Sequence, residues 1–184
     1  MASEQRGEPI GAELREEAPF AEEGSVPYGE ERRYLLFALA EVELAVELSR
    51  LEEVLEPGPV TRAPGAPPWV LGAANLRGQA LPVIDLAAKL GLGARSGAGV
   101  DDGRRPAILV FRPSAEAARI GVWVSGVLGF VEVGESAFGP PPRFGGPIAP
   151  ELIVGLVALA DRFVPVLDLA PAVSAESSGA VPVG

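Results

Sequence analysis

The feature that most constrains the fold is an internal repeat. A shift of 83 residues aligns "VLGAANLRGQALPVIDL" (residues 70–86) with "IVGLVALADRFVPVLDL" (residues 153–169), and both end in P-V-x-D-L. This agreement predicts a duplicated unit of strand, tight turn and a second strand interrupted by proline. Because proline cannot donate to a β-ladder, we expect Pro82 and Pro165 at an edge or a bulge, as at the corners of small β-barrels.

The rest of the composition favours an all-β fold. The chain of 184 residues contains 23 glycines and 19 prolines beside many short valine and leucine runs, a pattern typical of short strands joined by tight turns. We expect a hairpin that turns near Ala40 and Glu41, and a short helix after Asp85. Strands are predicted at residues 34–39, 41–47, 107–111, 119–124, 127–133, 152–159 and 162–169.

The segment that follows the first hairpin gives a mixed signal. Ser49 and Glu52 have the spacing of a capping box, so residues 49–58 are expected to form one or two helical turns or a bent strand. Five prolines between residues 57 and 68 then predict a stiff, extended connection.

The two ends of the chain differ from its middle. Residues 1–31 hold nine glutamates and two arginines, which is −7 of the total formal charge of −10, and they are predicted to be a disordered acidic tail. A loose C-terminal tail is expected at residues 174–184, which leaves 32–173 as the folded domain.

Charge and hydropathy limit the binding partners and the cellular location that we expect for the protein. The acidic balance disfavours nucleic acid and anionic lipid as partners. No secretory signal is recognisable, and the longest apolar run, residues 152–160, is far shorter than the ~20 residues of a membrane-spanning helix. We therefore expect a soluble, cytoplasmic protein without direct membrane insertion.

The sequence offers little material for catalysis. It contains neither cysteine nor histidine, which excludes disulfides, thiolate or imidazole metal ligands and a Ser-His-Asp triad. We expect no cofactor and no metal. Two interpretations exist for the duplicated Asp85 and Asp168: an acid–base dyad across a pseudo-twofold axis, or separate caps of the turns that follow. Both precede leucine rather than the small, hydroxyl-bearing residues of such a dyad, and capping is favoured.

The two copies of the repeat differ at their turn. The first has Asn75, Leu76, Arg77 and Gly78, where the second has "ALAD". A duplicated scaffold with one specialised turn indicates a binding site on that turn. Gly78 permits a positive φ and Asn75 can bond the local backbone, whereas a rigid turn could present the Arg77 guanidinium to a carboxylate, with Glu52 and Glu53 as candidate partners.

These residues carry a family resemblance. The stretches "YLLFALAEVELAVELSRL" and "EEVLEPGPVTRAPGAPPWVLGAANLRGQALPVIDL", together with "RPAILVF", "VSGVLGFVEV" and "GLVALADRFVPVLDL", resemble the CheW-like domain of bacterial chemotaxis coupling proteins. The resemblance covers residues 34–173, and N-L-R-G followed by P-V-I-D-L is its most specific part.

The resemblance implies a non-enzymatic adaptor built from two SH3-like five-stranded β-barrels. Members of the family link the cytoplasmic hairpin tips of chemoreceptors to the regulatory domain of the histidine kinase CheA, within membrane-associated arrays. Their receptor-binding surface includes positions matched here by Glu53, Gly72 and Arg77, and we add Asn75 and Gly78 as parts of the same turn. The alternatives are an SH3-like binding module for an unrelated ligand and the aspartate-dyad enzyme.

Overall fold

The computed structural model describes residues 31–93, 104–141 and 146–174. The acidic and C-terminal tails predicted for residues 1–31 and 174–184 lie outside this part, apart from Glu31 and Ser174. Most elements are strands, as predicted. They are β1 (Arg32–Leu39), β2 (Val42–Glu47), β3 (Leu51–Leu55), β4 (Val60–Thr61), β5 (Val70–Leu76), β6 (Gln79–Asp85), β7 (Ala107–Phe111), β8 (Ile120–Val124), β9 (Gly126–Val133), β10 (Phe138–Gly139), β11 (Ile153–Ala158) and β12 (Phe163–Leu167).

Short helical elements connect these strands. Two are α-helices, α1 (Leu86–Lys89) and α2 (Leu169–Ser174), each directly after one copy of the repeat. Three are single 3₁₀ turns, η1 (Leu48–Arg50), η2 (Glu135–Ala137) and η3 (Pro150–Leu152). The predicted hairpin turn at Ala40 and Glu41 and the predicted helix after Asp85 are confirmed.

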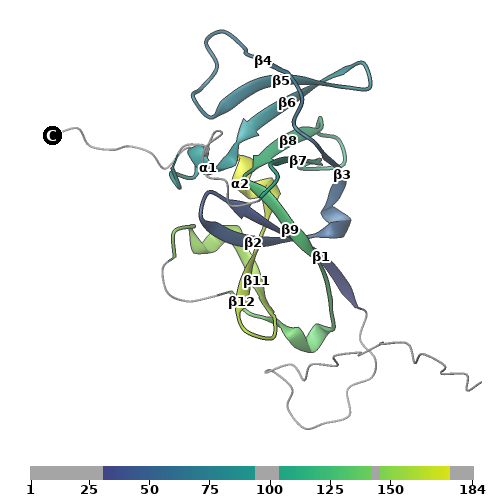
Figure 1. The fold of residues 1–184 in the computed structure, drawn as a ribbon, viewed down its shortest axis with the longest axis vertical. Coiled ribbons are helices and arrows are strands. Elements are labelled where there is room, and N and C mark those ends of the chain that lie inside the picture. Colours follow the sequence, from purple (N-terminus) through teal and green to yellow (C-terminus); the bar gives the residue numbers. More distant parts are fainter. Residues whose placement is uncertain (1–30, 94–103, 142–145, 175–184) are drawn as a thin grey trace, which may run out of the picture.

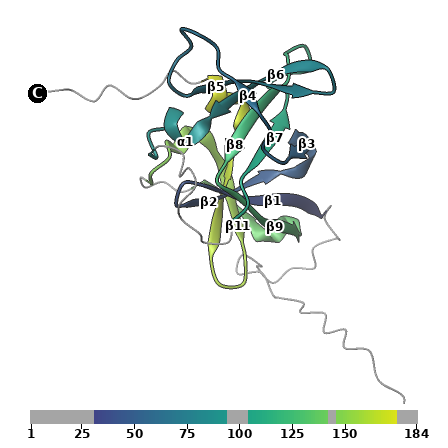
Figure 2. The same ribbon diagram turned by 45° about the horizontal axis from the view of Figure 1, so that its top comes forward.

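The strands form two sheets, one in each half of the molecule (Figures 1 and 2). Subdomain A has the strand order β10-β11-β12-β2-β1-β9, and subdomain B has β4-β5-β6-β8-β7-β3. Subdomain B is continuous in sequence and lies between β2 and β9, so subdomain A is assembled from both ends of the folded region. Each sheet contains five longer strands and one strand of two residues, where five strands per barrel were expected.

The repeat seen in the sequence is a repeat of backbone pairing. A register shift lies at Val70/Gly72 in β5 and again at Ile153/Gly155 in β11, 83 residues later. In both copies, pairing with a parallel neighbour begins one residue after the proline, at Val83 with β8 and at Val166 with β2. The prolines therefore lie where β6 and β12 have no ladder partner on one side, as predicted.

The core formed by the described residues consists of three apolar clusters. One cluster fills each barrel, with Tyr34 and Leu36 in subdomain A and Ile108 and Val110 in subdomain B. The third and largest lies between the sheets and includes the alternate residues of the same strands, among them Phe37 of β1. Because β1 and β7 bury both of their faces, "YLLFAL" and "AILVF" are apolar throughout rather than alternating.

The segment at residues 48–61 shows where the sequence pattern was misleading. Residues 48–50 form a 3₁₀ turn and β3 follows at once, but the predicted capping box is wrong. The Ser49 hydroxyl donates instead to the Glu47 carboxylate (2.8 Å), and Glu52 is paired with two arginines. The proline-rich connection also contains the short strand β4, which was not predicted because the surrounding prolines indicated an extended connection.

The single lysine of the chain has a structural position. Lys89 is buried, its ammonium lies 4.2 Å from the centroid of the Trp69 ring, and it donates to the Val173 carbonyl oxygen (2.5 Å). Burial lowers its pKa. The contact joins the end of α1 to the end of α2, and thereby links the two subdomains.

Candidate functional site

The turn between β5 and β6 is the specialised element of the repeat. Leu76 pairs with Gln79, which leaves Arg77 and Gly78 as a two-residue loop with φ values of 51° and 83°. Two positive φ values in such a loop are those of a type I′ turn, whose twist matches that of the flanking strands. The Asn75 side-chain oxygen accepts a hydrogen bond from the Gly78 amide (2.8 Å), so the predicted backbone roles of both residues are present.

Arg77 combines a strained backbone with an accessible guanidinium. Among described non-glycine residues, only Ala40 shares its positive φ, a conformation that costs about 1 kcal/mol or more. The side chain is 75% exposed, and its Nη2 atom donates to Glu53 Oε1 of β3 at 2.8 Å. Of the two carboxylates expected as partners, Glu53 is the one that binds Arg77.

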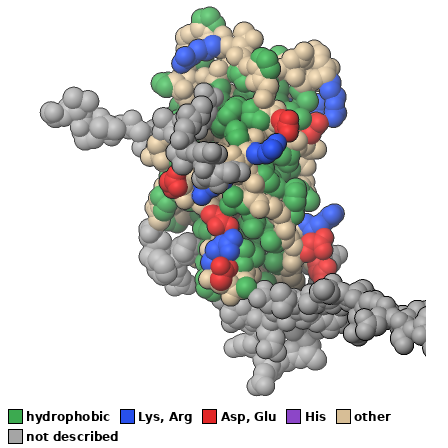
Figure 3. All heavy atoms as spheres, viewed as in Figure 1, with side chains coloured by type: hydrophobic (Ala, Val, Ile, Leu, Met, Phe, Trp, Pro, Cys, Tyr) green, Lys and Arg blue, Asp and Glu red, His purple; other side chains and the backbone are tan. Residues whose placement is uncertain are grey.

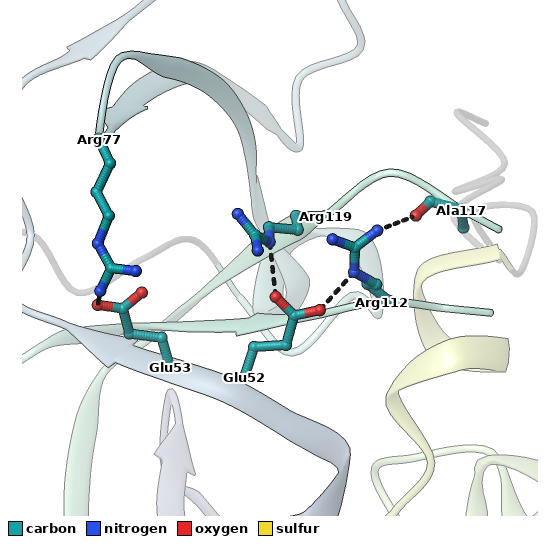
Figure 4. A network of polar contacts seen from close by, with 6 residues as sticks. All are labelled: Glu52, Glu53, Arg77, Arg112, Ala117 and Arg119. Carbon is teal, nitrogen blue, oxygen red and sulfur yellow. Dashed lines mark hydrogen bonds and ion pairs between the residues drawn. The ribbon is translucent and has the colours of Figure 1, made fainter. Parts of the chain in front are cut away.

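A bulge in β3 explains why two consecutive glutamates face the same side. Leu51 pairs with Phe111 and Glu53 with Val110, so Glu52 is an extra residue in the ladder. Successive residues of a regular strand would point to opposite faces. Figure 4 shows the Glu52 and Glu53 side chains directed to the same side of β3, Glu53 toward Arg77 and Glu52 toward Arg112 and Arg119.

Glu52 is the centre of a second ion-pair group that the sequence did not reveal. Its carboxylate accepts from Arg112 Nε (2.5 Å) and Arg119 Nε (2.6 Å), while Arg112 Nη1 donates to the Ala117 carbonyl oxygen at 3.2 Å (Figure 4). The hydrogen bond from Arg112, followed by that from Arg119, lowers the pKa of Glu52. Arg112 follows one predicted strand and Arg119 begins the next, so their proximity in a hairpin was predictable, whereas their pairing with Glu52 was not.

Gly72 has a steric role. Its φ is +136°, it is buried, and a Cβ atom added there would lie 2.0 Å from the Thr61 carbonyl oxygen of β4. Gly155 has the same place in the second copy, where a Cβ would lie 2.6 Å from the Gly139 carbonyl oxygen of β10. The two glycines therefore permit a close approach of strands in both subdomains, including the one without N-L-R-G.

The duplicated aspartates are caps. Asp85 accepts a hydrogen bond from the Ala88 amide of α1 (2.9 Å), and Asp168 accepts one from the Ala170 amide of α2 (3.2 Å). Within the described part of the chain, no hydrogen bond joins the two carboxylates. The capping interpretation is confirmed for both, and the geometry gives no support to a dyad.

The surface carries mixed charge. On the face seen in Figure 3, acidic and basic side chains lie next to one another at several places, separated by apolar ones. The described residues contain no group of three potential metal ligands. No described helix has the length and apolar character needed to cross a membrane.

The geometry thus defines a class: a protein of two SH3-like β-barrels with a polar site on one hairpin. Comparison with known proteins extends this result, because the model of the family described as "CheW-like domain" matches residues 33–177. The chain belongs to this family.

Relatives and a solved structure agree with this assignment. The chain is 28% identical over 150 residues to "Chemotaxis protein CheW" of Klebsiella aerogenes, covering 82% of this chain and 86% of the relative. It is 31% identical over 128 residues to "Protein FrzA" of Myxococcus xanthus, covering 69% and 74%. The crystal structure of scaffolding protein TtCheW from Thermoanaerobacter tengcongensis shares the fold, with a TM-score of 0.68 at 24% identity over 80% of this chain and 96% of that one.

Proposed function

We propose that the protein is a non-enzymatic adaptor that couples the cytoplasmic tips of chemoreceptors to the regulatory domain of the histidine kinase CheA. Membership of the CheW-like family and the chemotaxis names of its relatives support this function. Its place in the cell would be the cytoplasm, at receptor arrays, reached through its partners. The sequence contains neither histidine nor cysteine and so offers little material for catalysis.

The observation that carries the proposal is the Arg77–Glu53 pair. One hairpin of a duplicated pair holds an exposed guanidinium in a rigid type I′ turn and fixes it against a carboxylate of the neighbouring strand. A guanidinium held in this way can form a bidentate pair with a carboxylate of a receptor helix. Glu53, Arg77, Asn75 and Gly78 would form the receptor site directly, while Gly72 would support it by allowing β4 to approach β5.

Calorimetric titration with the host's receptor-tip fragment and, separately, its CheA regulatory domain tests this function. We expect the wild type to bind both partners and Arg77→Ala to weaken receptor binding about tenfold or more, as for an arginine at the centre of an interface. The matched control is Arg162→Ala, because Arg162 lies in the equivalent hairpin and pairs with Glu43 (2.8 Å). Arg162→Ala should bind the receptor as the wild type does.

Two results would contradict the proposal. If neither partner binds the wild type, the fold serves another ligand. If Arg77→Ala and Arg162→Ala lose the same affinity, the specialised turn is not the receptor site.

A further inference from the structure

A pocket with apolar walls and arginines at its edge opens beside the first residue of β1. Its volume is about 310 Å³, which is enough for one aromatic side chain with its neighbours. The walls include Phe111 and Val166, and the parallel rings of Tyr34 and Phe138, whose centroids are 6.3 Å apart. The Arg32 guanidinium lies 6.0 Å from the Phe138 ring centroid.

Arginines at the edge of this pocket can bind an anionic ligand. Arg32 and Arg50 line it, and so does Arg112, whose guanidinium is already paired with Glu52. Two carboxylates line it as well, and each accepts a hydrogen bond: Glu47 from the Ser49 hydroxyl and Asp168 from the Ala170 amide. An acidic peptide with an aromatic residue would therefore match both the walls and the edge.

The chain itself contains such a peptide. Residues 16–23 read "EEAPFAEE", in which Phe20 is flanked on each side by a pair of glutamates. We propose that this segment docks in the pocket of its own chain, with the Phe20 ring against the apolar walls and the glutamates paired with Arg32 and Arg50.

The connection is short enough to make this docking intramolecular. Eleven residues lie between Phe20 and Arg32, which itself lines the pocket. A chain of that length spans at most about 40 Å when extended, so the segment reaches every wall. A linker of this kind raises the effective concentration of the segment to the order of millimolar, and a weak peptide contact is then substantially occupied.

Paramagnetic relaxation enhancement in the full-length protein tests the docking without any partner. Because the sequence has no cysteine, Ala21→Cys accepts a spin label at one position next to Phe20. We expect strong broadening of the amide signals of residues 111–112 and 167–170 at the pocket. Glu132 and Val133 provide the internal reference, since they pair with Arg33 and Arg32 on the other flank of β1.

Variants and a high salt concentration distinguish specific docking of the segment from its random sampling of the protein surface. Phe20→Ala and Arg50→Ala should each reduce the docked population about tenfold and bring the pocket signals to the level of the reference residues. The control Arg162→Ala, an exposed arginine outside the pocket, should leave the broadening unchanged. Salt near 1 M should weaken it, since the Debye length is then about 3 Å.

Three outcomes would overturn the proposal. The first is equal broadening at the pocket and at residues 132–133. The second is broadening that neither Phe20→Ala nor Arg50→Ala changes. The third is broadening that appears when a spin-labelled chain is mixed with an isotope-labelled, unmodified one, because the segment would then dock on a second copy.

Discussion

The hairpins β5–β6 and β11–β12 occupy equivalent positions in the two subdomains and differ in what they present to solvent. Both have a register shift before the turn, a proline before the parallel pairing and an aspartate that caps the next helix. Only the first has two positive φ values at its turn and an arginine at the first of them. The two copies thus share the parts that build a barrel, and they differ at the turn that we propose as the receptor site.

The edges of the two sheets show a similar contrast. In subdomain B, Glu52 of β3 accepts hydrogen bonds from Arg112 and Arg119. In subdomain A, Glu132 of the corresponding strand β9 faces Arg33 at 3.8 Å, with both side chains more than half exposed. Of these two edges, the one in subdomain B therefore has the more compact ion pairs, while subdomain A has a compact pair, Arg162–Glu43 at 2.8 Å, at its own hairpin. Side chains that are already held in place on this edge of subdomain B would lose less conformational entropy when a partner binds.

The largest effect should come from the glycines that the two subdomains share. We expect Gly72→Ala to lower the free energy of unfolding by about 3 kcal/mol, because a Cβ would collide with the Thr61 carbonyl oxygen and φ is positive. For Gly155→Ala we expect about 2 kcal/mol, since one of its contacts, the Phe138 ring, can move while the Gly139 backbone cannot. Urea unfolding measures both.

The control for this pair is Gly58→Ala. No atom lies within 4 Å of a Cβ built at Gly58, so its stability should stay within about 0.5 kcal/mol of the wild type. If Gly72→Ala unfolds at the same urea concentration as this control, the steric role of Gly72 is wrong.

A smaller effect should come from the caps, and here the two copies should differ. Asp85→Ala is expected to cost about 1–2 kcal/mol and Asp168→Ala about 0.5 kcal/mol, because Asp85 is buried and its bond to the helix amide is shorter. Asp85→Asn keeps an acceptor and should recover most of the loss.

The double variant of the two aspartates tests the alternative hypothesis directly. Separate caps predict that the two losses add to within about 0.5 kcal/mol. A pronounced non-additivity would indicate that the carboxylates interact, as in a dyad, and would reopen that interpretation.

The sequence allowed the repeat, most strands, both caps and the turn to be predicted, because these depend on short-range patterns with strong local preferences. Pro82 and Pro165 indicated where β6 and β12 lack a ladder partner on one side, and Gly78 indicated the positive φ at the turn. The bulge at Glu52 and its arginines were not predictable in this way. They arise from pairing between β3 and β7, about 60 residues apart, which no local pattern encodes. Packing gives the glycine a steric role in both copies, beside the receptor-binding role that the family resemblance implies for Gly72.

The smallest effect should appear in the acid stability of the two sheet edges. The pKa of Glu52 in the folded protein is lowered below its ordinary value of 4.5 by Arg112 and Arg119. The ionised carboxylate therefore contributes stability that is fully present above about pH 4.5 and is lost as the pH falls through the lowered pKa. We expect Glu52→Gln to be less stable than the wild type near pH 7, with a gap that narrows toward about pH 3.

The matched variant Glu132→Gln sharpens this comparison. Its ion pair with Arg33 is long and exposed, so thermal unfolding of this variant should follow that of the wild type across the same range. If the gap for Glu52→Gln is the same at both ends of the range, the carboxylate acts through packing or neutral hydrogen bonds. If Glu132→Gln shows the larger pH dependence, the edge of subdomain A is the more strongly coupled one, and the ordered surface near the specialised turn is not distinguished by its ion pairs.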